Sequence, residues 1–329
     1  MRSEVKNKLT AVMIILCFFV VAAVSVSAIF ALTQQNVKTD VDFDYEAPSL
    51  DALTFTASSG GDSYSITKCN NSMLSGTTGV VVIPKVYNDL PIIGISDSAF
   101  ESCTNLKAVE IQDGVSVIGN RAFYSCTSLS RITMPNTITE IGESAFHSCS
   151  NLENVVLSNE LISIGKTAFY GCSKLTNMNI PSKVNTIGEY ILGYCESLTS
   201  LTVSDANQTY FDYGNCIITN STKTLIQGCK TSYLPQDGRV VIIGNRAFYN
   251  CRGLSEITIP SSVIQINNYA FYGCTNLQTA TFITSTGWFV ASSESATSGT
   301  TLSSTDLSNT STAATYLKTT YNNKYWKRV

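Results

Sequence analysis

The chain has 329 residues, with 21 Lys and Arg against 24 Asp and Glu, a formal net charge of −3, 44% hydrophobic residues and 14% charged residues. This hydrophobic content argues against a disordered chain, and without a basic stripe to hold phosphates we expect no nucleic-acid partner. The length exceeds that of one average domain, which a repeat array explains because it grows by stacking units.

An apolar segment, residues 11–32, contains no charged residue and follows a short stretch that includes three basic residues. As a helix it would span about 33 Å, enough for a bilayer core of about 30 Å, with the basic flank inside the cell. Residues 1–38 are therefore predicted to be either a signal anchor in the membrane or a signal peptide cleaved after Val26-Ser27-Ala28. Both alternatives place the rest of the chain outside the cell or on its surface.

Two short segments precede the repeats. Residues 39–51 are rich in Asp and Glu and are interpreted as a solvated acidic linker. Residues 52–75 contain two alternating stretches, around Phe55 and around Ile66, separated by Ser58-Ser59-Gly60-Gly61-Asp62. This pattern predicts a β-hairpin that caps the first coil of a solenoid.

A short motif recurs every 23 residues. It consists of Ala-Phe, a Cys three residues after the Phe, and a Leu three residues after the Cys. A fixed period of this length is the signature of a solenoid, which presents a long surface. The fifth copy has Ile191-Leu192 in place of Ala-Phe. The Ala-Phe copies are Ala99-Phe100, Ala122-Phe123, Ala145-Phe146, Ala168-Phe169, Ala247-Phe248 and Ala270-Phe271.

Each repeat also contains a short alternating segment, such as Val109 and Ile111, that predicts one β-strand per coil. Stacked coils would join these strands in one parallel ladder over residues 76–283. An Ile-Gly pair recurs on each return path, as at Ile118-Gly119, and we expect its glycine to adopt a turn conformation closed to other residues.

The 23-residue period is interrupted at residues 204–240. This longer segment predicts an insert with a protruding hairpin whose turn is Asn220-Ser221-Thr222-Lys223. Residues 284–329 are predicted to form a C-terminal cap, because both tryptophans lie there and need burial. The fold class is thus a leucine-rich repeat solenoid, in which short parallel strands stack in a ladder, the returns are irregular or short helical segments, and a cap closes each end.

One cysteine recurs in seven repeats, and we expect these side chains to be buried free thiols, because they lack the close pairs and His partners of zinc sites. For Cys216 and Cys229, which flank the insert hairpin, a disulfide and two free thiols both remain open. No cofactor, metal or catalytic site is expected. His147 is the single His, and it replaces a Tyr that follows the Phe in sister repeats. That tyrosine column is interpreted as packing between coils, with a binding stripe as the alternative.

The segments from Ile118 to Leu129 and from Ile243 to Leu254 resemble the BspA-like leucine-rich repeat proteins, and the insert and the C-terminal region resemble those of gut Firmicutes members. This resemblance implies a cell-surface protein that attaches to host matrix proteins or to other microbes.

The leading hypothesis is therefore an exported binding protein, an adhesin for a host or microbial protein or glycan. A structural surface or spacer protein without a specific ligand is the alternative, and a secreted hydrolase or inhibitor with a site around residues 210–233 is a third. The candidate ligand contacts are outward strand positions and the column that flanks them: Glu110, Arg131, Thr133, Asn154, Val156, Asn177, Asn179, Ser200, Thr202, Glu256 and Thr258. Thr281 is a further outward position, and Ala108 and Thr279 are further flanking positions.

Overall fold

The computed structural model of the chain describes residues 50–75 and 77–329. The predicted export segment, residues 1–38, and nearly all of the acidic linker lie outside the described residues. Ala47–Val329 form one compact unit. No helix within the described residues is long and apolar enough to cross a bilayer.

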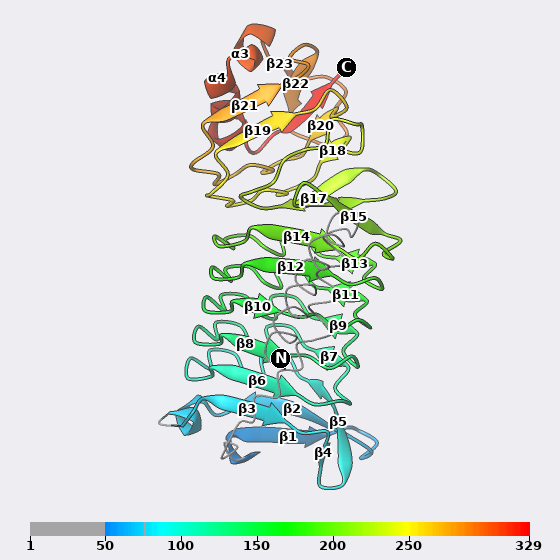
Figure 1. Cartoon of the computed structure of the whole chain (residues 1–329), viewed down its shortest axis with the longest axis vertical. Coiled ribbons are helices and arrows are strands. Elements are labelled where there is room, and N and C mark those ends of the chain that lie inside the picture. The colour runs from blue at the N-terminus through cyan, green and yellow to red at the C-terminus, as the bar shows by residue number, and fades with distance from the viewer. Residues whose placement is uncertain (1–49, 76) are drawn as a thin grey trace, which may run out of the picture. The chain divides into compact units, whose positions relative to one another are not determined.

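The described residues form a solenoid in which each regular coil outside the insert contributes one strand to a parallel ladder, named here the strand ladder (Figure 1). Coils pair in the register of the repeat, with Val109 beside Ile132 and Met178 beside Leu201. The sequence predicted one continuous ladder, but it consists of three sheets, β3-β6-β8-β10, β12-β14 and β19-β21. Its strands are β3 (Val80–Ile83), β6 (Ala108–Ile111), β8 (Arg131–Thr133), β10 (Asn154–Val155), β12 (Asn177–Ile180), β14 (Ser200–Val203), β19 (Glu256–Ile259) and β21 (Thr279–Phe282).

A second parallel ladder runs along the return path of the coils, where the Ile-Gly pairs lie. The sequence predicted irregular or short helical returns here, and that prediction is wrong, because two-residue strands are too short for a recognisable alternation. Its strands before the insert are β5 (Leu90–Ile95), β7 (Val117–Ile118), β9 (Glu140–Ile141), β11 (Ser163–Ile164) and β13 (Thr186–Ile187). The ladder continues through the last strand of the insert, β17 (Thr224–Gly228), into β18 (Ile242–Ile243) and β20 (Gln265–Ile266).

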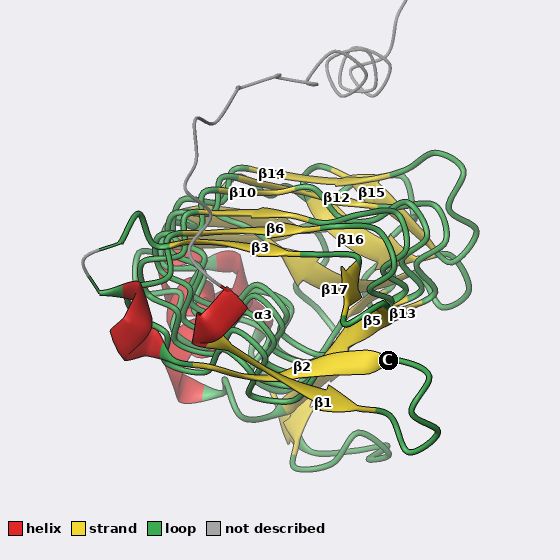
Figure 2. Cartoon of the chain, turned by 90° about the horizontal axis from the view of Figure 1, so that it is seen from below, coloured by secondary structure: helices red, strands yellow, loops and turns green. Residues whose placement is uncertain are grey.

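The core between the two ladders is built from repeated columns of buried side chains. Phe123 is fully buried, and its ring stacks on Phe100 at 4.8 Å and on Phe146 at 5.2 Å between centroids. Phe248 and Phe271 stack in the same way beyond the insert, at 5.0 Å. Figure 2 is viewed along the direction in which the coils stack and shows β3, β6, β10 and β14 lying over one another. The predicted leucine-rich repeat solenoid is confirmed.

The expectation for the Ile-Gly glycines is wrong. None of Gly119, Gly142, Gly165, Gly188 or Gly244 has a positive φ. A Cβ at Gly165 would lie 2.4 Å from the carbonyl carbon of Gly142, so the column is glycine because neighbouring coils approach too closely for a side chain. The residue with a left-handed backbone conformation is instead the one two positions after the glycine, as at Arg121, which has a φ of 55°.

The insert contains the predicted antiparallel hairpin around the turn at residues 220–223, but this hairpin does not protrude. The insert forms an antiparallel meander of β15 (Tyr210–Tyr213), β16 (Cys216–Thr219) and β17, and β17 then pairs parallel with β18. Ile217 and Ile218 are fully buried. The apolar character of β16 therefore draws the meander into the solenoid instead of leaving it in solvent.

Caps close both ends of the described solenoid, as predicted. At the N-terminal end β1 (Leu53–Ala57) and β2 (Tyr64–Cys69) form an antiparallel hairpin that joins β5, and β4 (Val86–Tyr87) also pairs with β5. Two short 3-10 helices lie beside it, η1 (Leu50–Ala52) and η2 (Asn71–Leu74).

The C-terminal cap adds a strand layer and short helices. Trp288 and Trp326 are buried in it, at 0% and 1% exposure, and Phe282 of the last coil packs edge-on against the Trp288 ring. The sequence therefore predicted this cap correctly. Its elements are β22 (Trp288–Ala291), β23 (Thr300–Thr301), α3 (Ser304–Ser308), α4 (Thr310–Thr315), the π-helical turn η3 (Tyr316–Thr320) and β24 (Tyr325–Arg328).

Candidate binding surface

The outward side of the strand ladder, named here the strand face, carries the positions that the sequence selected as ligand contacts. Pairing between coils sets Glu110 beside Thr133, Arg131 beside Asn154, and Asn179 beside Thr202. Beyond the insert, Glu256 lies beside Thr279 and Thr258 beside Thr281. Exposed members are Glu110, Arg131, Thr133, Asn154, Val156 and Glu256, and half-buried members are Asn177, Asn179, Ser200, Thr202 and Thr258.

The prediction that Ala108 flanks the ligand contacts on the outward surface is wrong, because this residue is only 7% exposed. Its methyl group is short, and the long side chains of Lys107 and Arg131 begin next to it in the chain and in the paired strand.

Polar side chains in the middle of the strand face bind one another. Thr202 Oγ1 donates to Asn179 Oδ1 at 2.9 Å, and Asn177 Nδ2 donates to Asn154 Oδ1 at 2.8 Å. A ligand at these positions would have to replace hydrogen bonds that the protein already makes.

The insert divides the strand face in two. At the edge of β14, the backbone N–H of Val203 donates to Asp212 Oδ1 at 2.7 Å, and that of Leu201 donates to Asn215 Oδ1 at 3.4 Å. Side chains of the insert thus occupy the edge where the next strand would pair. The single strip expected from the sequence is therefore two patches, one on β6 to β14 and one on β19 and β21.

The second patch is hollowed into a groove of about 510 Å³, named here the insert groove. Its floor is formed by β19 and β21, which present Glu256, Thr258 and Thr281. The insert segment 232–236 forms one wall, from which Tyr233 projects with 59% of its surface exposed. The size lies within the range of about 300–1,000 Å³ that is typical of small-molecule sites.

Sequence reasoning missed Tyr233, although a signal for it was present. Tyr233 precedes Leu234-Pro235 as Thr258 precedes Ile259-Pro260, so both stand at the same outward position of their coils. Leu234 and Ile259 are both buried, in agreement with this equivalence.

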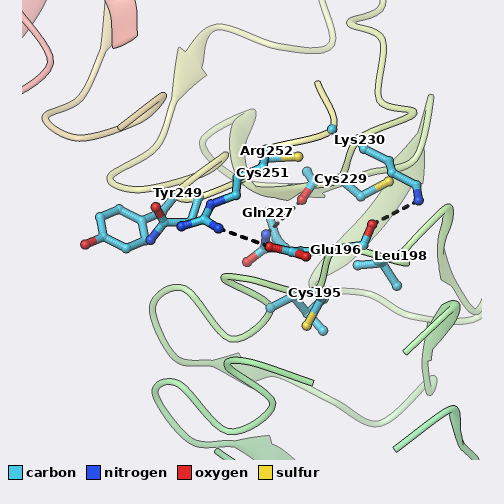
Figure 3. Close-up of a pocket in the computed structure, with 13 residues that line it drawn as sticks. Cys195, Glu196, Leu198, Gln227, Cys229, Lys230, Tyr249, Cys251 and Arg252 are labelled. Atoms are coloured by element: carbon cyan, nitrogen blue, oxygen red, sulfur yellow. Dashed lines mark hydrogen bonds and ion pairs between the residues drawn. The ribbon is translucent and has the colours of Figure 1, made fainter. Parts of the chain in front are cut away.

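A second, much smaller cavity lies at the seam between the coil of Leu192–Leu198 and the coil that follows the insert (Figure 3). Its volume is about 10 Å³, room for a single water molecule. Buried Gln227 Oε1 and Asn250 Nδ2 have no protein partner among the described residues. Arg252 Nη1 lies 3.4 Å from Glu196 Oε1, and Lys230 Nζ donates to the Glu196 carbonyl at 2.9 Å. These contacts join the two halves, and the cavity is too small for a ligand.

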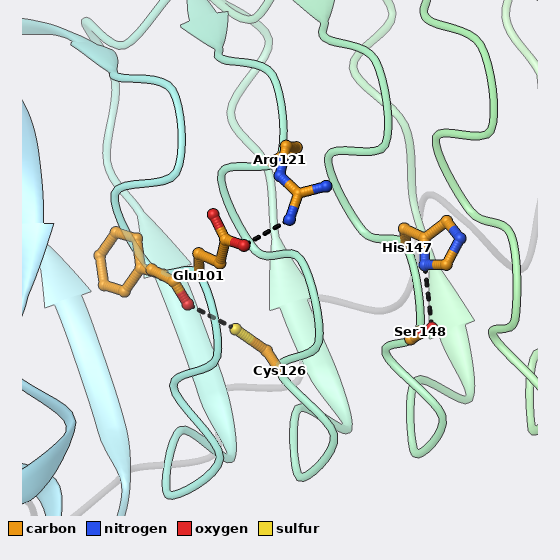
Figure 4. A network of polar contacts seen from close by, with 6 residues as sticks. Glu101, Arg121, Cys126, His147 and Ser148 are labelled. Carbon is orange, nitrogen blue, oxygen red and sulfur yellow. Dashed lines mark hydrogen bonds and ion pairs between the residues drawn. The ribbon is translucent and has the colours of Figure 1, made fainter.

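Aromatic side chains form a second stack along the turn edge, the side of the coils that carries the Ala-Phe turns. The His147 ring stacks between Tyr124 and Tyr170, at 4.7 Å from each centroid. Figure 4 shows His147 with Ser148, whose Oγ lies 2.9 Å from its Nδ1, and Arg121 paired with Glu101. Burial, and then the nearby Arg121 charge, lowers the pKa of His147. The stacked geometry supports packing between coils as the role of this column.

The described cysteines are free thiols, and the recurring column is buried apart from the half-buried Cys195 and Cys251. Burial raises the pKa of Cys149 and of Cys274 to about 12. The free thiols that the sequence predicted for this column are confirmed.

The disulfide that the sequence left open between Cys216 and Cys229 is absent, because both are free thiols. Cys216 pairs with Gly228 across the meander, one residue short of Cys229. Cys216 Sγ lies 3.5 Å from the Gly214 carbonyl oxygen, and Cys229 Sγ lies 3.2 Å from Thr231 Oγ1.

Solved structures with the same architecture include a T. pallidum leucine-rich repeat protein, 24% identical with a TM-score of 0.50, covering 70% of this chain and 91% of that one. A Bacteroides ovatus leucine-rich repeat protein is 22% identical with a TM-score of 0.50, covering 73% of this chain and 71% of that one. The pneumococcal vaccine antigen PcpA is 15% identical with a TM-score of 0.53, covering 72% and 70%. No curated protein matches the chain.

The model of the BspA type leucine rich repeat region matches residues 93–223 and 219–317. These ranges hold the Ala-Phe column, the Ile-Gly column and most strands of both ladders. The chain belongs to the BspA-type leucine-rich repeat family.

Proposed function

We propose that the chain is an exported cell-surface binding protein, an adhesin that recognises a host or microbial surface protein or glycan through its strand face. Family membership and the fold shared with a vaccine antigen support this proposal. The uncharged segment at residues 11–32 supports export, either as a membrane anchor or as a cleaved signal.

The observation that carries the proposal is the exposure of the strand face. Glu110, Thr133 and Val156 project from successive coils, and Val156 exposes 57% of its surface, a large apolar side chain on an otherwise polar face. Solenoids usually meet their partners on such an extended surface, and exposed apolar side chains within it favour a contact.

A structural spacer without a specific ligand is the second candidate. It is favoured by the hydrogen bonds from Thr202 to Asn179 and from Asn177 to Asn154, which already satisfy part of the strand face.

The test is a pull-down with residues 47–329, the compact unit, against host matrix proteins, immobilised glycans and whole bacteria. We expect specific retention of at least one class of target. The triple variant Thr133→Lys, Asn179→Lys and Thr202→Lys should abolish contacts made by the β6 to β14 patch. The exposed Thr133 site should change stability by about 0.5 kcal/mol or less, whereas the other two substitutions also remove the hydrogen bond between Asn179 and Thr202, which contributes about 1 kcal/mol. Absence of any specific target would favour the spacer.

A further inference from the structure

We propose that the insert groove binds a neutral saccharide, by hydrogen bonds to its floor and by stacking on Tyr233. This inference rests on the proposed function, because it assigns the recognition step of a surface-binding protein to one site. The lining residues used here are Tyr233 and Gln236 of the insert and Glu256, Thr258, Thr279 and Thr281 of β19 and β21.

The polar groups of the groove floor are free to bind a ligand. Within residues 50–75 and 77–329, the side chains of Glu256, Thr258, Thr279 and Thr281 make no hydrogen bond to another protein group. On the first patch, by contrast, the equivalent Asn179 and Thr202 bind each other. Three hydroxyls and one carboxylate at strand spacing match the hydroxyl groups of a sugar, which both donate and accept.

The aromatic wall is held in place by its neighbours. The Tyr213 ring meets the Tyr233 ring edge to face, at 5.7 Å between centroids. The Arg239 guanidinium lies 4.9 Å above Tyr213, and Asp237 pairs with Arg239 at 2.9 Å. Gly214 has a φ of 57, and a Cβ there would lie 2.2 Å from the Tyr233 carbonyl oxygen, so this glycine allows the close approach. A positioned, exposed ring offers the flat apolar face on which the C–H side of a sugar packs.

Charge and geometry select the ligand class. Glu256 is the charged residue among those that line the groove in the described chain, so an anionic saccharide would meet repulsion. A peptide that extends a sheet needs an open strand edge with unpaired backbone groups. β19 pairs only with β21 among the described strands, so one edge of β19 has no strand partner, but the groove floor itself consists of side chains on the two paired strands. These free side-chain hydroxyls beside an exposed ring favour a neutral saccharide over an acidic sugar, and binding of an extended peptide in place of every saccharide would overturn the inference.

The test uses the full chain, purified in a detergent without a sugar head group, on an array of neutral hexose and N-acetylhexosamine oligosaccharides with sialylated and sulfated analogues beside them. We expect retention on neutral members and measure their dissociation constants by titration calorimetry. Tyr233→Ala should weaken binding by about tenfold or more, Glu256→Gln should weaken it several-fold, and Tyr233→Phe should keep it. Tyr272→Ala is the matched control, a tyrosine 41% exposed on the turn edge.

Melting temperatures of all variants establish that they fold. The inference is overturned if the wild-type chain binds no neutral member, or if Tyr233→Ala binds as well as Tyr272→Ala. Matrix proteins and bacteria, untreated or treated with periodate to destroy sugar diols, separate the two proposals. Equal retention on treated and untreated targets removes the saccharide site and leaves the adhesin, whereas no retention on any target removes both.

Discussion

The thiol of Cys149 lies 3.1 Å from the carbonyl oxygen of Phe123, one coil earlier in the solenoid. The same oxygen accepts the backbone N–H of Cys126 at 3.2 Å. A buried carbonyl has two lone pairs, and here the sulfur of the next coil satisfies the second. The recurring cysteine is therefore a small apolar filler that also donates. Equivalent contacts join Cys126 to Phe100, Cys172 to Phe146, Cys195 to Phe169 and Cys274 to Phe248.

We expect the folded protein to react slowly with a thiol reagent, because burial keeps thiols such as Cys149 protonated and covered. After denaturation the column cysteines should react in full, and a reductant should leave the melting temperature unchanged. Thiol titration and calorimetry with and without reductant check this. A large fall in melting temperature on reduction would mean that disulfides support the fold.

Stability should decrease at alkaline pH. The pKa of Cys149, Cys195 and Cys274 is raised from 9.0 to about 12 by burial. Below pH 9 both states keep these protons, whereas between pH 9 and 12 the unfolded chain loses protons that the folded chain retains. Unfolding then becomes easier by about 1.4 kcal/mol per pH unit for each thiol. Melting temperatures from pH 7 to 11 measure the effect, and a flat profile above pH 9 would contradict it.

Phe123→Ala should lower the free energy of unfolding by about 3–5 kcal/mol, because it removes a fully buried ring from between two stacked neighbours. Val156→Ala is the control on the strand face, where a change within about 0.5 kcal/mol is expected. Urea unfolding of both variants provides the comparison. Similar small losses in the two variants would place the Phe column outside the core.

Gly165→Ala should destabilise the solenoid by about 1–3 kcal/mol or more, since its Cβ would lie 2.4 Å and 2.5 Å from backbone atoms of the preceding coil. Gly60→Ala is the matched control, because the nearest atom to its Cβ is 3.7 Å away. Neither glycine has a positive φ, so the comparison isolates the steric effect. If Gly165→Ala unfolds at the wild-type urea concentration, the coils separate more easily than their spacing indicates.

Asp212→Ala should cost about 1–3 kcal/mol, because the Val203 N–H at the edge of β14 loses its acceptor. Asp212→Asn keeps an oxygen acceptor there and should stay close to wild type at pH 7. Burial raises the pKa of Asp212, so its contribution to stability is fully present below the ordinary pKa of 3.8 and is lost as pH rises through the raised value. The melting temperature of the wild type should therefore rise relative to that of Asp212→Asn as the pH falls from 7 to 4. Equal loss in both variants would assign no role to the acceptor.

Much of the fold could be predicted from the period alone. A residue type that recurs every 23 positions, such as Phe123 and Phe146, must meet its copies in a stack, and the two tryptophans required a cap. The reason for the Gly165 column could not be predicted, because the sequence contains no measure of the distance between coils. The second ladder was missed for a similar reason, as two-residue strands such as β7 are defined by neighbours and not by their own pattern.

The candidate binding surface was harder to predict from the sequence than the fold. The outward positions were identified correctly as a column, but their division depends on Asp212 and Asn215, which bind the edge of β14 from within the insert. No local pattern reveals such a long-range contact. Whether Thr258 and its neighbours bind a ligand stays a proposal.

The insert leaves the turn edge of the stack continuous. On the turn edge, Glu189 and Glu196 reach across it to Arg246 and Arg252, each 56 or 57 residues later, and the Arg246 guanidinium lies 4.8 Å above the Tyr190 ring. The turn edge thus continues directly from the coil before the insert to the coil after it, whereas on the strand face the insert leaves the insert groove open. Lengthening or shortening the segment of the insert around residues 232–236 would then change the width of the insert groove and leave every regular coil intact, so this segment sets the shape of the strand face independently of the coils that carry it.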